Sequence, residues 1–406
     1  MKYVAGLRCR ECGNEYLVSP QHVCELCFGP LEVIYDAEAI AADVTRAELD
    51  RGDTSMWRFA AFLPAPDERV DIGAGGTRLI AAPRLAAEIG LRKLWLKSDA
   101  PNPTHSFKDR VVSVALSMAR HFGYEVAACA STGNLANAVA AHAAAAGMKS
   151  IVFIPADLER GKIAATTIYG GEVIGVEGSY DDVNRLCAEL AGSKPWAFVN
   201  VNMRPFYAEG SKTIAFEIAQ QLGWRSPDAV VVPIASGSLL TKVAKGFREF
   251  EQAGLIENKP VKIAGAQAAG CAPVAEAFVA GVEDVRPVKP ATIARSLAIG
   301  DPADGYYALQ EVRGSSGSIA NVPEEEVVSG IELLARTEGI FTETAGGVAI
   351  SGLERLVRSG AILPGEETVV LITGIGLKTL EVTRGESPTH IIKPQVEALA
   401  EVLSWQ

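Results

Sequence analysis

The chain has 406 residues, 48% of them hydrophobic, which is enough to build large buried cores. Its formal net charge of -11 argues against nucleic acid as a partner, because binding a phosphate backbone requires a clustered basic face. The sequence shows neither an apolar run of about 18 residues nor a secretory leader, so we expect a cytoplasmic protein without a membrane partner.

The first 35 residues contain two closely spaced pairs of cysteines, Cys9-x2-Cys12 and Cys24-x2-Cys27. This spacing is typical of a zinc ribbon, in which two turns present four thiolates tetrahedrally. Four reduced thiols without a metal are the alternative. Four protein ligands leave no open position on the ion, so we expect a structural zinc rather than a catalytic one.

The pattern from residue 36 to about residue 71 is helical and irregular, which indicates a connector that wraps onto the body of the protein. Beyond Gly73, β-branched apolar runs alternate with helical stretches, as in parallel sheets covered by helices on both faces. The expected strands are residues 93–97, 125–130, 150–154, 172–176, 197–201, 230–234, 262–265 and 368–372.

Together with the chain length and the cysteine pairs, this alternation predicts an α/β protein with two doubly wound α/β domains and a small N-terminal zinc ribbon. We divide the chain into a zinc-ribbon-like module (residues 1–35), a connector with the start of the large domain (36–110), a small α/β domain (111–215) and the rest of the large α/β domain (216–406). In such folds ligands bind at the carboxyl ends of the strands, so the turns there should carry the chemistry.

The first of these turns is N-P-T-H-S-F-K-D-R, residues 102–110. The helix expected after it is apolar around most of its circumference, which predicts a buried helix with a lysine, Lys108, at its start. Either the ammonium group of Lys108 reaches water or a carboxylate, or the lysine is desolvated and used as a nucleophilic amine.

Three further turns follow expected strands. Ser131, Thr132, Gly133 and Asn134 precede an alanine-rich helix, where free amides and hydroxyls suit a carboxylate; simple N-capping is the alternative. Ser236, Gly237 and Ser238 form a turn whose amides can bind a phosphate, although an ordinary α/β loop has the same pattern. Thr373, in T-G-I-G-L-K, can hydrogen-bond an unprotonated ring nitrogen.

Together the four turns provide an amine, a carboxylate site, a phosphate site and a partner for a ring nitrogen. A pyridoxal-phosphate enzyme needs this set, with the lysine forming a Schiff base to a cofactor that acts as an electron sink.

The motif P-T-H-S-F-K-D-R resembles the lysine motif of threonine synthases, and S-T-G-N, E-G-S-K-T and T-G-I-G-L-K follow in matching order. The resemblance implies the fold of the type II pyridoxal-phosphate enzymes, which tryptophan synthase β shares. It implies that Lys108 carries pyridoxal phosphate, that Asn134 binds the phenolic oxygen of the cofactor and that Thr373 binds its ring nitrogen. The phosphate would be held by Ala235, Ser236, Gly237, Ser238 and Leu239, and the substrate carboxylate by Ser131, Thr132 and Gly133.

The sequence also departs from the family pattern. Leu135 stands where a threonine often helps to bind the substrate phosphate, Tyr207 where an arginine is common, and His105 where glycine is common. For the substrate phosphate we therefore nominate Asn202, Arg204 and Thr132 as partners.

The resemblance implies a threonine synthase, which converts O-phospho-L-homoserine and water to L-threonine and phosphate. A related β-replacement or elimination enzyme is the alternative, similar to a cysteate synthase acting on O-phosphoserine or to a threonine or serine dehydratase. A non-catalytic protein that binds a partner through its zinc ribbon is a third candidate. We expect a small amino-acid substrate and a homodimer. Glu343 either faces the cofactor ring or caps the helix that begins after it.

Overall fold

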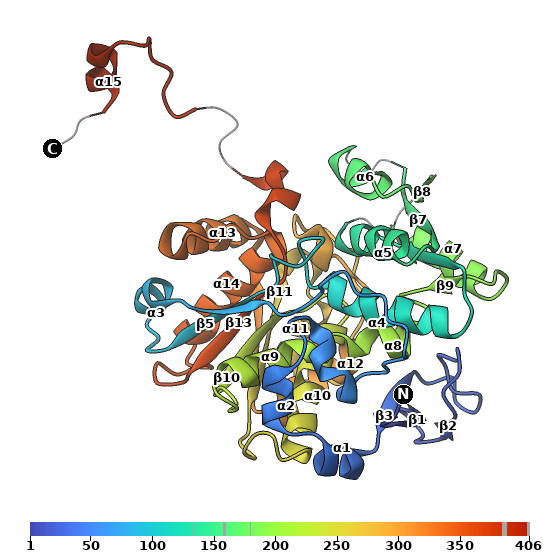
Figure 1. Ribbon diagram of the computed structural model, residues 1–406. Coiled ribbons are helices and arrows are strands. Elements are labelled where there is room, and N and C mark those ends of the chain that lie inside the picture. The colour runs from blue at the N-terminus through green and yellow to red at the C-terminus, as the bar shows by residue number, and fades with distance from the viewer. Residues whose placement is uncertain (132, 157–159, 179, 384–387, 404–406) are drawn as a thin grey trace.

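The computed structural model describes residues 1–131, 133–156, 160–178, 180–383 and 388–403 (Figure 1). The N-terminal module is a small antiparallel sheet of order β2-β1-β3, formed by β1 (Val4–Cys9), β2 (Glu15–Tyr16) and β3 (Leu31–Tyr35). It lies against the body of the protein, where β3 contacts helix α8 (Arg204–Glu209).

The connector is helical, as predicted. It consists of α1 (Ala37–Asp43), α2 (Arg46–Arg51) and the 3₁₀ helix η1 (Met56–Phe62). Side-chain caps open both α-helices, since Asp36 accepts from the amide of Ala39 and Thr45 forms a capping box with Glu48. Local polar contacts therefore define where these helices begin.

Two aromatic side chains of η1 fix the connector to the body. The rings of Phe59 and Phe62 lie 5.4 Å and 5.1 Å from the ring of Phe216. Phe216 in turn stacks on Phe250 with ring centroids 4.3 Å apart. All four rings are buried, and aromatic pairs of this kind contribute about 0.5–1.5 kcal/mol each beyond the area they bury.

A six-stranded sheet of order β12-β11-β10-β13-β5-β4 forms the centre of the molecule. Neighbouring strands are parallel except β4, which pairs antiparallel with β5. The strands are β4 (Arg78–Ala81), β5 (Leu94–Ser98), β10 (Ala229–Pro233), β11 (Lys262–Ala268), β12 (Ile319–Val322) and β13 (Thr368–Ile372).

A second, four-stranded sheet is entirely parallel and has the order β8-β7-β6-β9. Its strands are β6 (Val126–Ala130), β7 (Lys149–Pro155), β8 (Glu172–Val176) and β9 (Ala197–Phe198). All eight predicted strands are confirmed, although β9 is shorter than expected. The division into domains at residues 35, 110 and 215 stays a prediction.

Helices cover both sheets (Figure 1). The long helices include α4 (Lys108–His121), α5 (Asn134–Ala145), α7 (Tyr180–Ala191), α10 (Ser238–Gln252), α13 (Glu324–Glu338) and α14 (Thr344–Arg358). The others are α3 (Pro83–Ile89), α6 (Arg160–Thr167), α9 (Lys212–Gln221), α11 (Pro273–Ala280), α12 (Gly305–Gly314), α15 (Val396–Val402) and the short 3₁₀ turns η2 (Ala269–Cys271), η3 (Arg295–Leu297), η4 (Gly376–Lys378) and η5 (Leu380–Val382).

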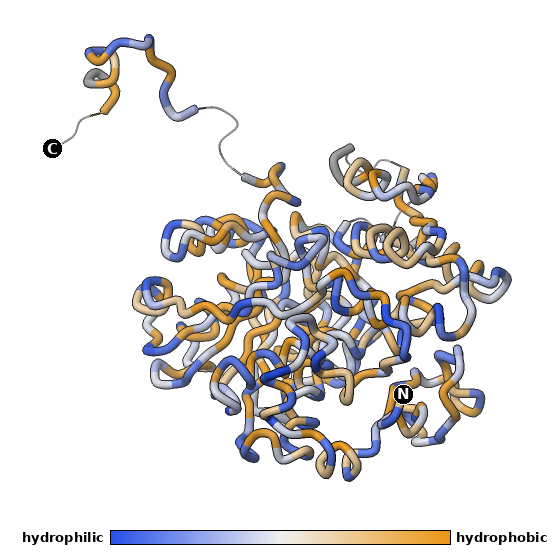
Figure 2. Tube along the Cα trace, viewed as in Figure 1, coloured by the Kyte–Doolittle hydropathy of each residue, from blue (hydrophilic) through white to orange (hydrophobic). Residues whose placement is uncertain are grey.

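Hydrophobic residues follow the inner strands and helices, as Figure 2 shows. Every residue of α4 from Asp109 to Ala119 is buried, which confirms the prediction of a buried helix after Lys108. Helix α15 lies apart from the body (Figure 1). Among the described helices, none has both the length and the apolar character that crossing a bilayer requires.

Candidate active site and metal site

The turn that carries Lys108 lies at the carboxyl edge of the six-stranded sheet, between β5 and α4. It is held against the neighbouring strand end, since the amide of Phe107 donates to the carbonyl of Thr373 at 2.9 Å and Ser106 forms an isolated β-bridge with Gly374. Strands β5 and β13 are parallel neighbours, so the turns after them meet at one edge. The fold thereby brings Lys108 and Thr373 together.

The amine of Lys108 contacts a neutral group. Its Nζ donates to the hydroxyl of Tyr207 at 2.9 Å and lies 4.6 Å from the centroid of the Phe107 ring. Within the described residues, no ion pair joins Lys108 to a carboxylate. This arrangement matches a lysine kept available for chemistry better than a lysine that forms a structural salt bridge.

Asn134 and Thr373 meet at a common carboxylate, Glu343. The amide nitrogen of Asn134 donates to Glu343 Oε2 at 2.8 Å, and the hydroxyl of Thr373 donates to Oε1 at 3.3 Å. Lys378 joins the cluster, because its Nζ donates to Asn134 Oδ1 at 2.8 Å and to the carbonyl of Thr104 at 2.5 Å. Burial raises the pKa of Glu343 and lowers the pKa of Lys378.

The predicted phosphate turn connects β10 to α10. Gly237 adopts a left-handed conformation with φ of 93°, and a Cβ at this position would lie 2.5 Å from the carbonyl oxygen of Asp304. The first amides of a helix have no intrahelical acceptors, and in α10 the N-cap residue Gly237 provides no side-chain cap; the amide of Ser238 has only a long contact of 3.5 Å with the hydroxyl of Ser236. The turn therefore needs a glycine at position 237 and offers amides to an anion.

The turn after β6 contains the residues predicted to bind the substrate carboxylate. The hydroxyl of Ser131 accepts hydrogen bonds from the amides of Gly133 and Ala136 at 3.2 Å and 3.1 Å. Ser131 therefore caps the start of α5, which is the alternative to carboxylate binding that the sequence left open. A Cβ on Gly133 would meet no atom within 4 Å, so the space beside the turn is open. Thr132 lies outside the described residues. Substrate binding by Ser131 and Gly133 stays a prediction.

Asn202 and Arg204 lie at the start of α8. Asn202 is buried and donates to the carbonyl of Trp196 at 2.9 Å, while its Oδ1 has no hydrogen-bond partner within the described part of the chain. The guanidinium of Arg204 pairs with Asp304 at 2.9 Å. Arg204 is thus bound beside the phosphate turn, and Tyr207, rather than Arg204, contacts Lys108.

The sequence did not reveal the contacts that Tyr207, Glu343 and Lys378 make in this site. Lys378 ends the T-G-I-G-L-K motif, and the position of Glu343 before α14 was visible, but neither pattern states what the side chain faces. His105 has a left-handed φ of 63°, which explains why glycine is common there. Its Nδ1 lies 3.3 Å from the carbonyl of Ala100, so it contacts its own loop.

The residues present fit pyridoxal phosphate. The amine of Lys108, the amides of α10 and the polar cluster around Glu343 correspond to the carbonyl, the phosphate and the ring of the cofactor. In addition, the buried hydroxyls of Ser106 and Thr344 have no hydrogen-bond partner among the described residues, as expected for side chains that face a bound polar molecule.

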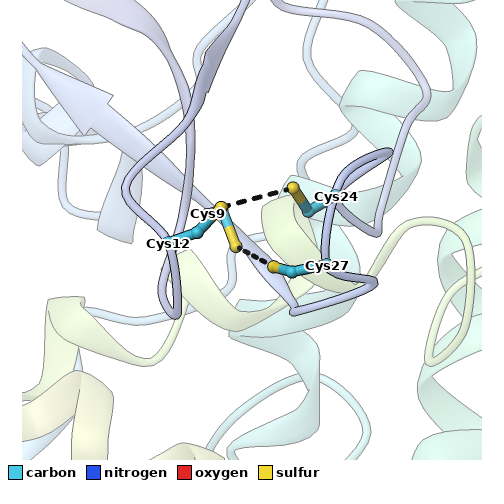
Figure 3. Close-up of side chains that lie close together, drawn as sticks. All are labelled: Cys9, Cys12, Cys24 and Cys27. Atoms are coloured by element: carbon cyan, nitrogen blue, oxygen red, sulfur yellow. Dashed lines mark hydrogen bonds between the residues drawn. The ribbon is translucent and has the colours of Figure 1, made fainter.

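The four cysteines of the N-terminal module form one cluster (Figure 3). All four sulfur atoms lie within 4.8 Å of one another, and the pairs Cys9–Cys27 and Cys12–Cys24 are 3.5 Å and 3.6 Å apart. Zinc–sulfur bonds of about 2.3 Å in a tetrahedron place the sulfurs about 3.8 Å apart, so the cluster fits zinc. A hydrogen bond with the Tyr16 hydroxyl lowers the pKa of Cys24 to about 6, which favours the thiolate.

A cavity of about 550 Å³ lies elsewhere, between the N-terminal module and α10. Its walls include Arg8, Glu32, Tyr35, Lys245 and Glu249 and none of the residues predicted to bind cofactor or substrate. The candidate active site is therefore recognised by its chemistry rather than by an open volume.

Solved structures share the fold. The chain matches a fungal L-serine ammonia-lyase from Rhizomucor miehei with a TM-score of 0.64 and 22% identity, over 76% of this chain and 95% of that one. It matches a threonine deaminase from T.th. with a TM-score of 0.59 and 24% identity, over 77% and 94% of the two chains. At these identities the likeness shows the architecture alone, that of the type II pyridoxal-phosphate fold.

A family model and relatives of higher sequence identity show which family the chain belongs to. The model of the pyridoxal-phosphate dependent enzymes matches residues 70–374. A threonine synthase of Methanocaldococcus jannaschii is 41% identical over 91% of this chain and 92% of its own length, and one of Methanosarcina acetivorans is 37% identical over 98% of both. With matches of this extent, the chain belongs to the pyridoxal-phosphate dependent enzymes and, among them, to the threonine synthase family.

Proposed function

We propose that this protein is a pyridoxal-phosphate-dependent threonine synthase that converts O-phospho-L-homoserine and water to L-threonine and phosphate. The observation that carries the proposal is the amine of Lys108, bonded to Tyr207 at 2.9 Å beside the strand ends that present Thr373 and the phosphate turn. The relatives that are 36–41% identical support the choice of reaction.

The cofactor would be held at three places. Lys108 would hold its carbonyl carbon, and the turn of Ala235, Ser236, Gly237, Ser238 and Leu239 would hold its phosphate. Asn134 would bind its phenolic oxygen and Thr373 its ring nitrogen. When bound, pyridoxal phosphate supplies an electron sink for negative charge on the carbon beside the substrate amino group. The buried Glu343 carboxyl orients both Asn134 and Thr373.

Lys108 would also move protons. The reaction removes protons from the α- and β-carbons, releases phosphate from the γ-carbon, adds water at the β-carbon and returns protons to the carbon skeleton. Nζ of Lys108 would lie close to these atoms once the lysine is free of the cofactor, and the Tyr207 hydroxyl beside it fixes the position of the amine. Arginine is common at position 207 in the threonine synthases, and an arginine there would place a second positive charge beside the Lys108 ammonium.

The amide turn of residues 131–134 would bind the substrate carboxylate. Asn202, with its Oδ1 unpartnered among the described residues, and Arg204 remain our nominees for the side that receives the leaving phosphate. Arg204 would reach the substrate only by exchanging its contact with Asp304 for one with the phosphate. We further propose that the protein is cytoplasmic and forms a homodimer. Dimers with twofold symmetry are the commonest soluble oligomers, and light scattering of the purified protein tests the dimer.

The reaction is tested with the purified protein and two substrates, O-phospho-L-homoserine and O-phospho-L-serine, by following phosphate release and the mass of the product amino acid. We expect phosphate and threonine from O-phospho-L-homoserine. Lys108→Ala should abolish turnover and the visible absorbance of the bound cofactor, whereas Lys149→Ala, an exposed lysine at the start of β7, should change neither.

Phosphate release from O-phospho-L-serine alone would assign the protein to the β-replacement or elimination enzymes. If the wild type binds zinc but shows no visible cofactor absorbance, a non-catalytic protein that binds a partner through its zinc ribbon would be favoured. Either result would overturn the proposal.

A further inference from the structure

The loop between the first two cysteines touches the body of the protein at the start of α12. The guanidinium Nη1 of Arg10 lies 3.2 Å from Asp304 Oδ1, and the same group stacks on Tyr307, 3.5 Å from the ring centroid. The neighbouring Glu11 accepts a short hydrogen bond from the Tyr307 hydroxyl. Both residues between Cys9 and Cys12 therefore bind the same turn of the body.

Asp304 contacts the predicted phosphate turn with its backbone. Its amide donates to the carbonyl of Ser236 at 2.8 Å, and its carbonyl oxygen lies where a side chain on Gly237 would be. The carboxylate of Asp304 is buried and binds Arg10 on one side and Arg204 on the other. One residue thus joins the cysteine loop to the turn from which α10 begins.

A second contact from the same module reaches α10 itself. Glu32 of β3 pairs with Nζ of Lys242 at 3.2 Å and of Lys245 at 3.3 Å, and Lys245 donates to the carbonyl of Val33 at 2.8 Å. Lys242 lies one turn beyond Ser238, where α10 begins. The module therefore binds the start of α10 from two directions.

We propose that Arg10 and Asp304 are positioning residues for the cofactor phosphate, so that the metal-filled module forms part of the cofactor site. The inference rests on the proposed function, which assigns the phosphate to Ala235–Leu239. Ligation of Cys9 and Cys12 fixes the conformation of Arg10 and Glu11 between them. Arg10 then holds Asp304, and Asp304 aligns the turn whose amides bind the phosphate.

The test measures the affinity of the cofactor-free protein for pyridoxal phosphate and for pyridoxal, which lacks the phosphate, by absorbance titration. For Arg10→Ala, and for zinc-depleted wild type, we expect the dissociation constant of pyridoxal phosphate to rise at least about tenfold, because the partly buried charged hydrogen bond between Arg10 and Asp304 is lost. The affinity for pyridoxal should change little, and the ³¹P chemical shift of the bound cofactor should move.

Two controls separate positioning from general loss of structure. Arg8→Ala removes a residue of β1 whose partner, Glu15, lies within the module, and it should leave the affinity for pyridoxal phosphate unchanged. Arg10→Lys should restore part of the affinity because it keeps the charge but not the planar fork. Returning zinc to the depleted protein should restore the wild-type constant.

An unchanged dissociation constant for pyridoxal phosphate in both Arg10→Ala and the zinc-depleted protein would overturn this inference and leave the proposed function intact. Equal losses of affinity for pyridoxal phosphate and pyridoxal would also overturn it, because the phosphate turn would not be the part affected. Failure of the wild type to bind pyridoxal phosphate would instead overturn the proposed function.

Discussion

Glu343 is a residue of the candidate site whose ionisation lowers the stability of the folded protein. It is buried, and burial raises the pKa of its carboxyl although the Asn134 amide and the Lys378 ammonium oppose this. A carboxyl whose pKa is raised by folding binds its proton more tightly in the folded state. Ionisation of Glu343 therefore weakens the fold as the pH rises above the ordinary value of 4.5.

We expect Glu343→Gln to raise the free energy of unfolding of the cofactor-free protein relative to wild type, with a larger gain at pH 8 than at pH 5. The neutral amide keeps an acceptor for Asn134 and removes the buried charge. Turnover should fall, because the orientation of Asn134 and Thr373 changes. Urea unfolding at the two pH values checks the first expectation.

Glu354→Gln is the matched control, since Glu354 lies on the same helix and pairs with Arg358 at a partly exposed position. Its effect should be about 0.3–0.5 kcal/mol at most. A gain for Glu343→Gln that is identical at pH 5 and pH 8 would contradict the raised pKa.

Helix α10 depends on the conformation of the residue before it. Gly237→Ala would introduce a left-handed alanine, which costs about 1–2 kcal/mol, and would drive its Cβ towards the Asp304 carbonyl. We expect the phosphate turn to move and the affinity for pyridoxal phosphate to fall by at least about tenfold. Absorbance titration and urea unfolding measure the two effects.

Gly254→Ala tests the same helix at its other end. Gly254 also has a left-handed φ, of 66°, but a Cβ there would meet no atom within 4 Å. This variant should lose a similar amount of stability from the backbone alone and should keep its affinity for pyridoxal phosphate. Equal losses of affinity in the two variants would show that the contact with Asp304 is not the cause.

The sequence was most informative about elements with strong local patterns. Continuous apolar runs predicted the central strands, because strands buried on both faces carry little polar sequence. The edge strands β4 and β12 were not predicted, since each has only four residues and β4 is not buried on either face. Helix starts such as Glu343 before α14 were readable from the acidic residue and the apolar helix after it.

The contents of the site were predictable only in part. Lys108 and Thr373 follow β5 and β13, and because these strands are parallel neighbours in one sheet, their ends lie side by side. Asn134 follows β6 of the other sheet, so its meeting with Thr373 at Glu343 also depends on how the two sheets pack. Tyr207 and Asp304 are different, because their contacts join segments that are distant in sequence. Tyr207 reaches Lys108 across 99 positions, and Asp304 reaches Arg10 across 294. Nothing in the local sequence encodes such contacts.

At the scale of the whole molecule, a buried network of four charges holds the lysine helix on the central sheet. Arg110 pairs with Asp99 and Glu217, each at 2.7 Å, and Lys97 pairs with Glu217 at 2.6 Å. All four side chains are almost fully buried. Although burial opposes it, Arg110 and Lys97 hold the pKa of Glu217 well below its usual range.

We expect Arg110→Met to destabilise the protein by about 3–5 kcal/mol, because removing one partner leaves buried carboxylates without compensation. Arg120→Met on the same helix is the control: Arg120 pairs with Glu68 at a solvent-exposed position and should cost about 0–1 kcal/mol. Denaturant unfolding of both variants measures the difference. A cost of less than about 1 kcal/mol for Arg110→Met would show that the network does not support α4.

The pairing of β5 with β13 has a consequence for how the protein is made. Residues 94–98 have their partner at residues 368–372, and the Lys108 turn is closed by Thr373 and Gly374. During synthesis on the ribosome, the edge of β5 that pairs with β13 stays unpaired until more than two hundred further residues have been added. The turn that carries Lys108 is therefore complete only after nearly all of the chain has emerged, and a translation product that ends before β13 lacks the contacts that close it.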